Sequence, residues 1–243
     1  MNPNIIIGGR TIPSWYAMLA IGVIAATALA IYARPKDFPL SRTQILTLGI
    51  FVILFGLLGA RILFIILNRD IAQLSLREIF SFSGGFAYFG ALVLDIFVFW
   101  AYARLRKIKF LSLVDYCTPF LMLSQVFVRV GCFLAGCCYG KPTGFIFGVA
   151  FKSVDKVVRH PTQIYEAVLL LAIYWTSRII YEKRRDTPGY TFSITLILYG
   201  VGRFLVEFFR ADSPAVIFNI TVAQVACLSL ALLALAILPR AQK

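Results

Sequence analysis

Charged residues are scarce in this sequence. They make up 14% of its 243 residues, against about a quarter in an ordinary soluble domain, while 60% of the residues are hydrophobic. This balance excludes an ordinary soluble domain. Histidine occurs once, as His160, and nothing in the sequence supplies partners for a metal ion, so His160 is interpreted as a helix-start or interface residue. No nucleic-acid-binding motif or cofactor motif is present, so we expect no nucleic-acid partner, no cofactor and no catalytic metal.

Cysteine is also rare, and its spacing shows neither the C-x-x-C pairs of zinc and redox sites nor a disulfide framework. The five cysteines are Cys117, Cys132, Cys137, Cys138 and Cys227. Three of them fall in R-V-G-C-F-L-A-G-C-C-Y-G-K-P-T, residues 129–143, whose Gly131, Gly136 and Gly140 allow close approach of backbone or ligand. These three cysteines are consistent with small helix-packing residues, covalent participation, a disulfide or a metal site.

Apolar runs of about 20 residues recur along the chain, which is typical of a polytopic helical membrane protein. We predict an all-α fold with seven transmembrane helices in a single integral membrane domain, residues 1–243. The first run is too long for a signal peptide and lacks a basic segment before it, so we interpret it as an uncleaved span. The expected spans are 14–33, 44–68, 84–103, 110–135, 162–180, 190–209 and 216–238, and residues 136–161 form a long extracytoplasmic loop segment.

The distribution of Lys and Arg predicts the orientation. One set of alternate connections, together with the C-terminus, holds thirteen of the 24 basic residues, and the opposite set holds eight. Cytoplasmic loops carry the excess of basic residues, so the N-terminus is expected outside and the C-terminus in the cytoplasm.

The remaining three basic residues, Arg61, Arg129 and Arg203, lie inside predicted spans. All three fall in the outer half of the bilayer in the expected orientation, so we interpret them as sharing one anionic partner. The alternatives are an arginine that snorkels from a helix end and a salt-bridged stripe that makes the helix tolerable in lipid.

Four carboxylates are candidate counter-charges for these arginines: Asp95, Asp115, Glu166 and Glu207. The sequence R-F-L-V-E-F-F-R places Arg203, Glu207 and Arg210 on one helical face. Asp95 and Asp115 are expected instead to pair with the basic cluster at 104–109.

Several motifs in order along the chain resemble the prolipoprotein diacylglyceryl transferases of the bacterial cytoplasmic membrane. The resemblance covers nearly the whole sequence. It is carried by Trp15-Tyr16, Gly59-Ala60-Arg61-Ile62, Gly84-Gly85, Asp115, the 129–142 signature, H-P-T-Q-I-Y-E at 160–166 and Y-G-x-x-R-F-x-x-E-F-F-R at 199–210.

This resemblance implies an enzyme that transfers the diacylglyceryl group of phosphatidylglycerol to the lipobox cysteine thiol of a preprolipoprotein and releases glycerol phosphate. It implies an inner-membrane location with the active site facing the outer leaflet, and phosphatidylglycerol, the lipobox peptide and membrane lipid as partners. The implied catalytic residues are Arg129 and Arg203 on the phosphate, with Tyr16 and Tyr199 near the reacting centre. The implied substrate-binding residues are Arg61, Gly84, Gly85, Gly90, Gly131, Cys132, Gly136, Gly140, Gln163, Glu207 and Arg210.

The sequence departs from the family pattern at the side that would activate the acceptor. Phe89 stands where the family has a histidine, a candidate base for the thiol. Cys132, Ala135 and Cys137 stand where the family usually has Asn, Asn and Glu. The alternatives are therefore a phosphatidylglycerol-using transferase with another acceptor and a non-catalytic phospholipid-binding membrane protein. A thiol oxidoreductase built on Cys137 and Cys138 is a more distant alternative.

Overall fold

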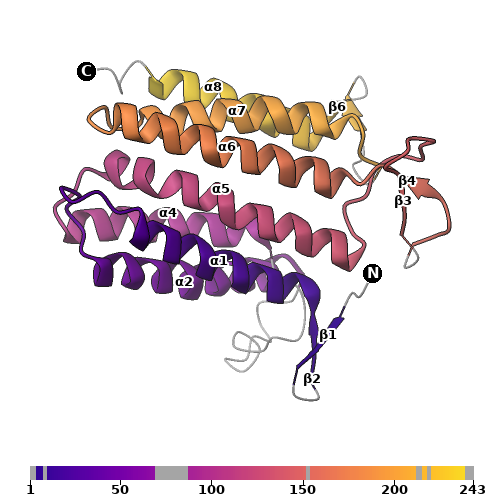
Figure 1. Ribbon diagram of the computed structural model, residues 1–243, viewed down its shortest axis with the longest axis horizontal. Helices are drawn as coiled ribbons and strands as arrows, with labels where there is room; N and C mark the ends of the chain where they lie inside the picture. The colour runs from indigo at the N-terminus through magenta and orange to yellow at the C-terminus, as the bar shows by residue number, and fades with distance from the viewer. Residues whose placement is uncertain are drawn as a thin grey trace. The chain divides into compact units, whose positions relative to one another are not determined.

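The computed structural model describes residues 4–7, 10–68, 87–151, 154–211, 215–217 and 220–238 (Figure 1). Within these residues the chain forms seven α-helices and three two-stranded antiparallel sheets. The chain divides into two compact units, residues 1–29 with 114–243, and residues 30–113.

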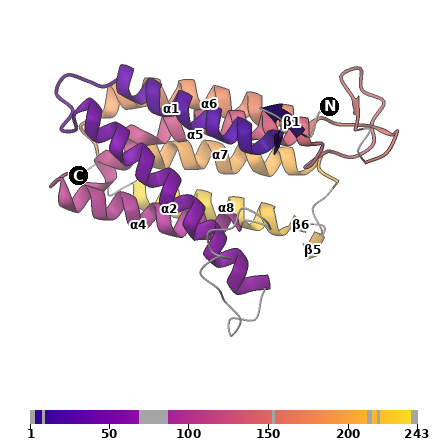
Figure 2. The ribbon, with the colours of Figure 1, turned by 90° about the horizontal axis from the view of Figure 1, so that it is seen from below.

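The first unit is a helical layer in which successive helices run in alternating directions. It holds most of α1 (Ser14–Tyr32) and α5 (Phe110–Ala135), and all of α6 (Thr162–Arg184), α7 (Tyr190–Glu207) and α8 (Val222–Ile237). Helices α6 and α7 lie side by side, and α8 packs beside α7 (Figures 1 and 2).

Short hairpins gather at one end of this unit, where α1, α6 and α8 begin and α5 and α7 end (Figure 1). They are β1–β2 (Asn4–Ile7 with Arg10–Pro13), β3–β4 (Val149–Ala150 with Val158–Arg159) and β5–β6 (Ala215–Ile217 with Ile220–Thr221). The second lies in the 136–161 segment, which the sequence predicts to be long enough for structure of its own. The other two were not anticipated.

Two helix starts in the first unit differ from what the sequence predicts. The span expected from residue 216 is helical only from Val222, because Thr221 and Gln224 form a capping box and β5–β6 occupies the preceding residues. The expected pairing of Asp115 with the 104–109 cluster is also wrong. Its carboxylate accepts hydrogen bonds from the backbone N–H groups of Gly189 (2.6 Å) and Phe192 (2.8 Å) at the start of α7.

This capping of α7 has a simple physical basis. The first N–H groups of a helix have no partner within the helix, and they attract negative charge. Asp115 is 1% exposed, so it satisfies these donors where water does not reach. Gly189 has a positive φ of 89°, which brings the chain sharply into α7.

The second unit is organised by the crossing of α2 (Arg42–Asn68) and α4 (Tyr88–Leu105). The two helices touch through backbone: a Cβ built on Gly59 would lie 2.3 Å from the Gly90 carbonyl oxygen, and one on Gly90 would lie 2.1 Å from that of Gly59. Only glycine fits such a contact, which is typical of packed membrane helices. Asp95 lies against Gly56 in the same interface.

The helices have the composition of a multi-pass membrane protein. Four helices in the described part of the chain, α1, α2, α5 and α6, are long and apolar enough to cross a bilayer. Large apolar side chains also point outward, including Ile24 (67% exposed), Leu67 (68%) and Leu232 (67%). Outward-facing apolar side chains on helices whose backbone is satisfied internally are what lipid contact requires.

Candidate active site

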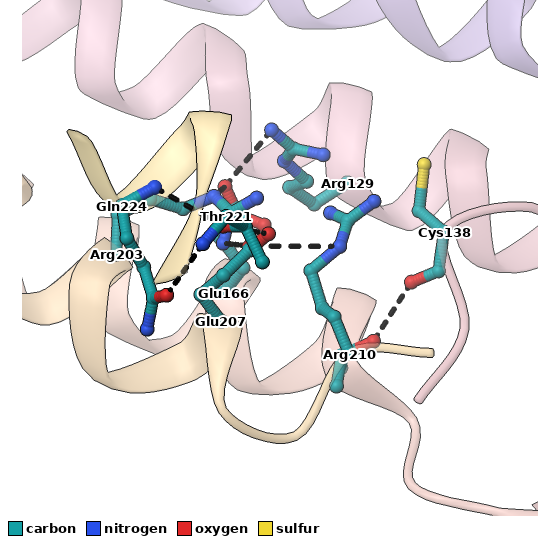
Figure 3. A network of polar contacts seen from close by, with 9 residues as sticks. Arg129, Cys138, Glu166, Arg203, Glu207, Arg210, Thr221 and Gln224 are labelled. Carbon is teal, nitrogen blue, oxygen red and sulfur yellow. Dashed lines mark hydrogen bonds and ion pairs between the residues drawn. The ribbon is translucent and has the colours of Figure 1, made fainter. Parts of the chain in front are cut away.

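A buried ladder of alternating charges joins α5, α6 and α7 in the first unit (Figure 3). We call it the charge ladder; its members are Arg129, Glu166, Arg203, Glu207 and Arg210. The side chains of both carboxylates are 1% exposed, and those of the three arginines are 10–19% exposed. Charges removed from water to this extent are costly unless they are paired, and the ladder pairs them.

Glu166 is the point at which two arginines from different helices meet. Its Oε1 lies 2.8 Å from Nη2 of Arg129 and 3.4 Å from Nε of Arg203. The intramembrane arginines were predicted to share one anionic partner, and Arg129 and Arg203 share this protein carboxylate. Arg61 belongs to the other unit, where it is buried on α2 with its guanidinium over the ring of Phe64.

Glu207 forms the second junction of the ladder. It pairs with Arg203 one turn earlier and lies 3.8 Å from Nε of Arg210. Thr221, the N-cap of α8, donates a hydrogen bond of 3.0 Å to its Oε1. The Arg203–Glu207 pair predicted from the R-F-L-V-E-F-F-R spacing is therefore confirmed. Arg210 also approaches Glu207, but it lies past the end of α7 in a β-bridge with Gly140, so the predicted helical face does not reach it.

Among the described members of the ladder, three guanidinium groups contact two carboxylates. Arg129 Nε is buried and has no hydrogen-bond partner among the described residues. Tyr199 is close enough to Arg129 for an electrostatic interaction. This arrangement suits a further anion with several acceptor oxygens, such as a phosphate, because guanidinium groups bind such oxygens in charge-assisted hydrogen bonds.

Hydrogen bonds to its backbone join the loop after α5 to the start of α6 and the end of α7, beside the charge ladder. The Cys137 carbonyl accepts from Gln163 Nε2 (2.5 Å), and the Cys138 carbonyl accepts from Thr162 Oγ1 (2.7 Å). Further on, Gly140 N–H donates to the His160 carbonyl (2.9 Å) and Lys141 N–H donates to the Phe209 carbonyl (2.8 Å).

The predicted glycines are mostly packed against protein. A Cβ on Gly131 would meet Trp15 Cα at 2.9 Å, and one on Gly140 would meet His160 Cβ at 2.6 Å. Gly136 has a φ of 73° and turns the chain at the end of α5. Gly90 forms the α2–α4 crossing, while Gly84 and Gly85 lie outside the described residues.

The remaining predicted residues occupy separate positions in their units. Tyr16 stacks on Trp15 at the start of α1, with ring centroids 3.7 Å apart. Phe89 lies in the first turn of α4 and is 69% exposed. His160 accepts or donates a hydrogen bond with the Tyr165 hydroxyl (3.0 Å) and packs among aromatic rings, consistent with a structural role.

Three thiols cluster beside the charge ladder. The Sγ atoms of Cys132, Cys137 and Cys138 all lie within 4.8 Å of one another. Hydrogen bonds with the Cys132 and Cys137 thiols hold the pKa of the Cys138 thiol well below its ordinary value; burial opposes this shift, and the charges of Arg210 and Arg129 add to it.

Two residues of this site, Thr162 and Thr221, were not predicted from the sequence; both position other groups through hydrogen bonds. Glu166 was predicted as a counter-charge but not as the junction of the ladder, and Gln163 was predicted as a site residue but not as a partner of the Cys137 carbonyl. The T-Q-I-Y-E run after Pro161 is the signal that points to Thr162, Gln163 and Glu166.

Comparison with known proteins agrees with these features. The family model for prolipoprotein diacylglyceryl transferase matches residues 5–240. The chain belongs to this family. The family membership predicted from the sequence motifs is thereby confirmed.

Named relatives cover most of the chain. It is 34% identical to the phosphatidylglycerol–prolipoprotein diacylglyceryl transferase of Clostridium tetani, over 84% of this chain and 83% of the relative. It is 32% identical to transferase 2 of Clostridium perfringens, over 84% and 81%. It is 29% identical to the transferase of Dehalococcoides mccartyi strain 195, over 94% and 88%.

Proposed function

We propose that this protein transfers the diacylglyceryl group of phosphatidylglycerol to the cysteine thiol of a prolipoprotein. The names of the relatives state this donor and this acceptor. The observation that carries the proposal onto this chain is the buried charge ladder, in which Arg129 and Arg203 meet on Glu166 and Arg129 Nε, among the described residues, still has a hydrogen bond to donate, since the donor is an anionic phospholipid.

The proposed reaction builds negative charge on a phosphate oxygen, which the arginines of the ladder can stabilise. The acceptor sulfur attacks the glyceryl carbon, the carbon–oxygen bond breaks, and its electron pair leaves with the phosphate oxygen of glycerol phosphate. Arg129 and Arg203 bind that phosphate, and their prior attachment to Glu166 means that little reorganisation is needed as charge develops. Removing one such preorganised donor typically costs about 100-fold or more in turnover.

The other predicted site residues support these two arginines. Glu207 and Arg210 hold Arg203 in its orientation, and Tyr199 lies beside Arg129. Tyr16 is proposed to hydrogen-bond near the reacting centre. For the remaining residues a substrate-binding role stays a proposal: Arg61, Gly84, Gly85, Gly90, Gly131, Cys132, Gly136, Gly140 and Gln163.

The proposed topology places this site near the outer leaflet. All seven described helices cross the cytoplasmic membrane in this topology, with the N-terminus outside and the C-terminus inside, as the distribution of basic residues favours. The charge ladder then lies at the outer end of α5, α6 and α7, where secreted prolipoproteins arrive. The chain acts as one integral membrane domain.

The test is a transfer assay with purified protein, labelled phosphatidylglycerol and a lipobox peptide. Cysteine-dependent label on the peptide, absent with a Cys→Ser peptide, is the expected result. The alternative that Phe89 favours is a lipid-binding protein without chemistry. Phosphatidylglycerol binding with no label on either peptide would establish that alternative and reject transfer to prolipoprotein.

A further inference from the structure

The three clustered thiols form a compact set of soft donor atoms. Cys132 lies in the last turn of α5, and Cys137 and Cys138 lie in the loop that follows. Their Sγ atoms are within 4.8 Å of one another, and those of Cys137 and Cys138 are 3.7 Å apart. All three cysteines are free.

These separations match the demands of a metal ion. Zinc–thiolate bonds are about 2.3 Å long, so two sulfurs on one tetrahedral zinc are separated by about 3.8 Å. The Cys137–Cys138 separation of 3.7 Å already meets this value. A small inward movement of Cys132 completes a three-sulfur face, which leaves the fourth tetrahedral position open, the pattern of catalytic rather than structural zinc.

The backbone holds the donors in this arrangement. Cys138 itself has a positive φ of 61°, an unfavourable conformation for a residue with a side chain, which turns its Sγ back toward its neighbours. The carbonyls of Cys137 and Cys138 are bound by Gln163 and Thr162, each 1% exposed. Side chains that only fill space would not require such fixation.

Charge and access distinguish this cluster from the other cysteines. Cys137 is exposed, whereas Cys227 is buried and Cys117 is partly exposed like Cys132 and Cys138. Three thiolates with one Zn²⁺ carry a net negative charge, and Arg210 and Arg129 are close enough to Cys138 to interact with it electrostatically (Figure 3). The cluster thus lies between solvent and the charge ladder.

We propose that Cys132, Cys137 and Cys138 bind one Zn²⁺ whose open position takes the cysteine thiol of the acceptor. The role of the ion rests on the proposed function, because transfer to a cysteine requires a sulfur nucleophile. A thiol that coordinates zinc is deprotonated, and its proton is released to water. The thiolate sulfur then forms the bond to the glyceryl carbon while the carbon–oxygen bond breaks toward the phosphate. Zinc would thus favour loss of the thiol proton, a task for which the Phe89 side chain has no basic group.

The first experiment measures metal binding independently of the transfer reaction. Full-length protein is purified in detergent, reduced, stripped with a chelator and titrated with Co²⁺ as a spectroscopic substitute for Zn²⁺. We expect about one equivalent to bind with a thiolate-to-cobalt charge-transfer band, and one equivalent of Zn²⁺ to abolish that band. Absence of the band, or the finding of a disulfide among the three cysteines in the protein as isolated, would overturn the proposal.

Matched variants separate this site from the other thiols. The C117S/C227S variant keeps the three clustered cysteines and is expected to bind Co²⁺ like the unmodified protein. The single variant Cys138→Ala is expected to lose the charge-transfer band while eluting as the same folded species. Retention of the band in Cys138→Ala, or its loss in C117S/C227S, would contradict the assignment of the ligands.

The second experiment tests the open position and separates this proposal from the proposed function. Adding a lipobox peptide to the Co²⁺-loaded protein should change the band, and the Cys→Ser peptide should not. Removal of Zn²⁺ should lower transfer at least tenfold, with recovery on adding it back. Full transfer by the metal-free protein would reject the role of zinc alone. A change of the cobalt band by the cysteine peptide in a protein that transfers no label would reject the proposed function but keep the site.

Discussion

Two buried carboxylates of the first unit are satisfied in opposite ways. Asp115, near the start of α5, accepts from two backbone N–H groups of α7, whereas Glu166, near the start of α6, receives two arginine side chains. Both are 1% exposed. The negative charge of Asp115 is balanced by the N–H groups at the start of a helix, whereas Glu166 belongs to a network of arginines and carboxylates that joins three helices. We expect the first arrangement to stabilise the fold and the second to serve substrate binding.

The largest effect is expected from Arg129→Ala, which should lower transfer by about 100-fold or more. The substitution removes a proposed phosphate ligand and leaves Glu166 with the Nε of Arg203 at 3.4 Å as its remaining partner in the described ladder. The measurement is the initial rate of labelled peptide formation. Arg178→Ala is the matched control, since Arg178 pairs with Glu182, which is 64% exposed, and should keep near-normal transfer. Near-normal transfer by Arg129→Ala would remove this residue from the phosphate role.

A smaller effect is expected from Glu166→Gln, which keeps the shape of the side chain and removes its charge. Arg129 and Arg203 lose their shared anion, so they are held less firmly before the phosphate arrives. We expect kcat to fall by about tenfold with a small change in the KM for phosphatidylglycerol, because binding of an anion is not weakened by one negative charge fewer. An unchanged kcat would show that Glu166 contributes to folding alone, as Asp115 is expected to do.

Asp115→Asn should affect stability and leave transfer nearly intact. An amide has one acceptor oxygen where the carboxylate has two, so one of the two N–H groups at the start of α7 loses its partner. We expect a loss of about 1–3 kcal/mol of stability, seen as a lower unfolding temperature in detergent. Asp186→Asn, at the exposed turn before α7, is the control. A loss of transfer without loss of stability would contradict a purely structural role of Asp115.

The smallest effect is expected at Asp155, a partly exposed carboxylate of the 136–161 segment. Its hydrogen bond with Arg159 lowers the pKa of Asp155, so the charged form is favoured in the folded loop. This support is present above the ordinary pKa of an aspartate and is lost as the pH falls through the lowered value. The protection of the β4 backbone against hydrogen exchange, measured relative to the intrinsic exchange rate at each pH, should therefore fall only in acid. Asp155→Asn should abolish that pH dependence. Transfer at neutral pH should stay unchanged.

Features encoded locally could be predicted from the sequence. The expected span 110–135 coincides with α5, because its apolar run has clear ends. The Arg203–Glu207 pair follows from residues one helical turn apart. The start of α8 was misplaced because apolar residues at 215–217 are equally suited to a short strand, and a hydropathy pattern does not separate the two.

Features encoded by distant segments could not be predicted. Asp115 and Gly189 are 74 positions apart, and nothing local shows that a helix start will need that carboxylate. Glu166 was one of four candidate counter-charges, and only the packing of α5, α6 and α7 selects it. The thiol cluster likewise depends on left-handed turns at Gly136 and Cys138, which the C-x-x-x-x-C-C spacing does not encode.

The backbone attachment of the 137–141 loop has a consequence for how this site diversifies. Main-chain hydrogen bonds, rather than the side chains at 132, 135 and 137, join the loop to His160 and Phe209. The side chains at those three positions can therefore change while the backbone of the loop keeps its hydrogen bonds. Amides and carboxylates can be exchanged for thiols without redesign of the surrounding helices. A lineage can therefore alter the acceptor side of its chemistry by point substitution while the phosphate side is inherited unchanged.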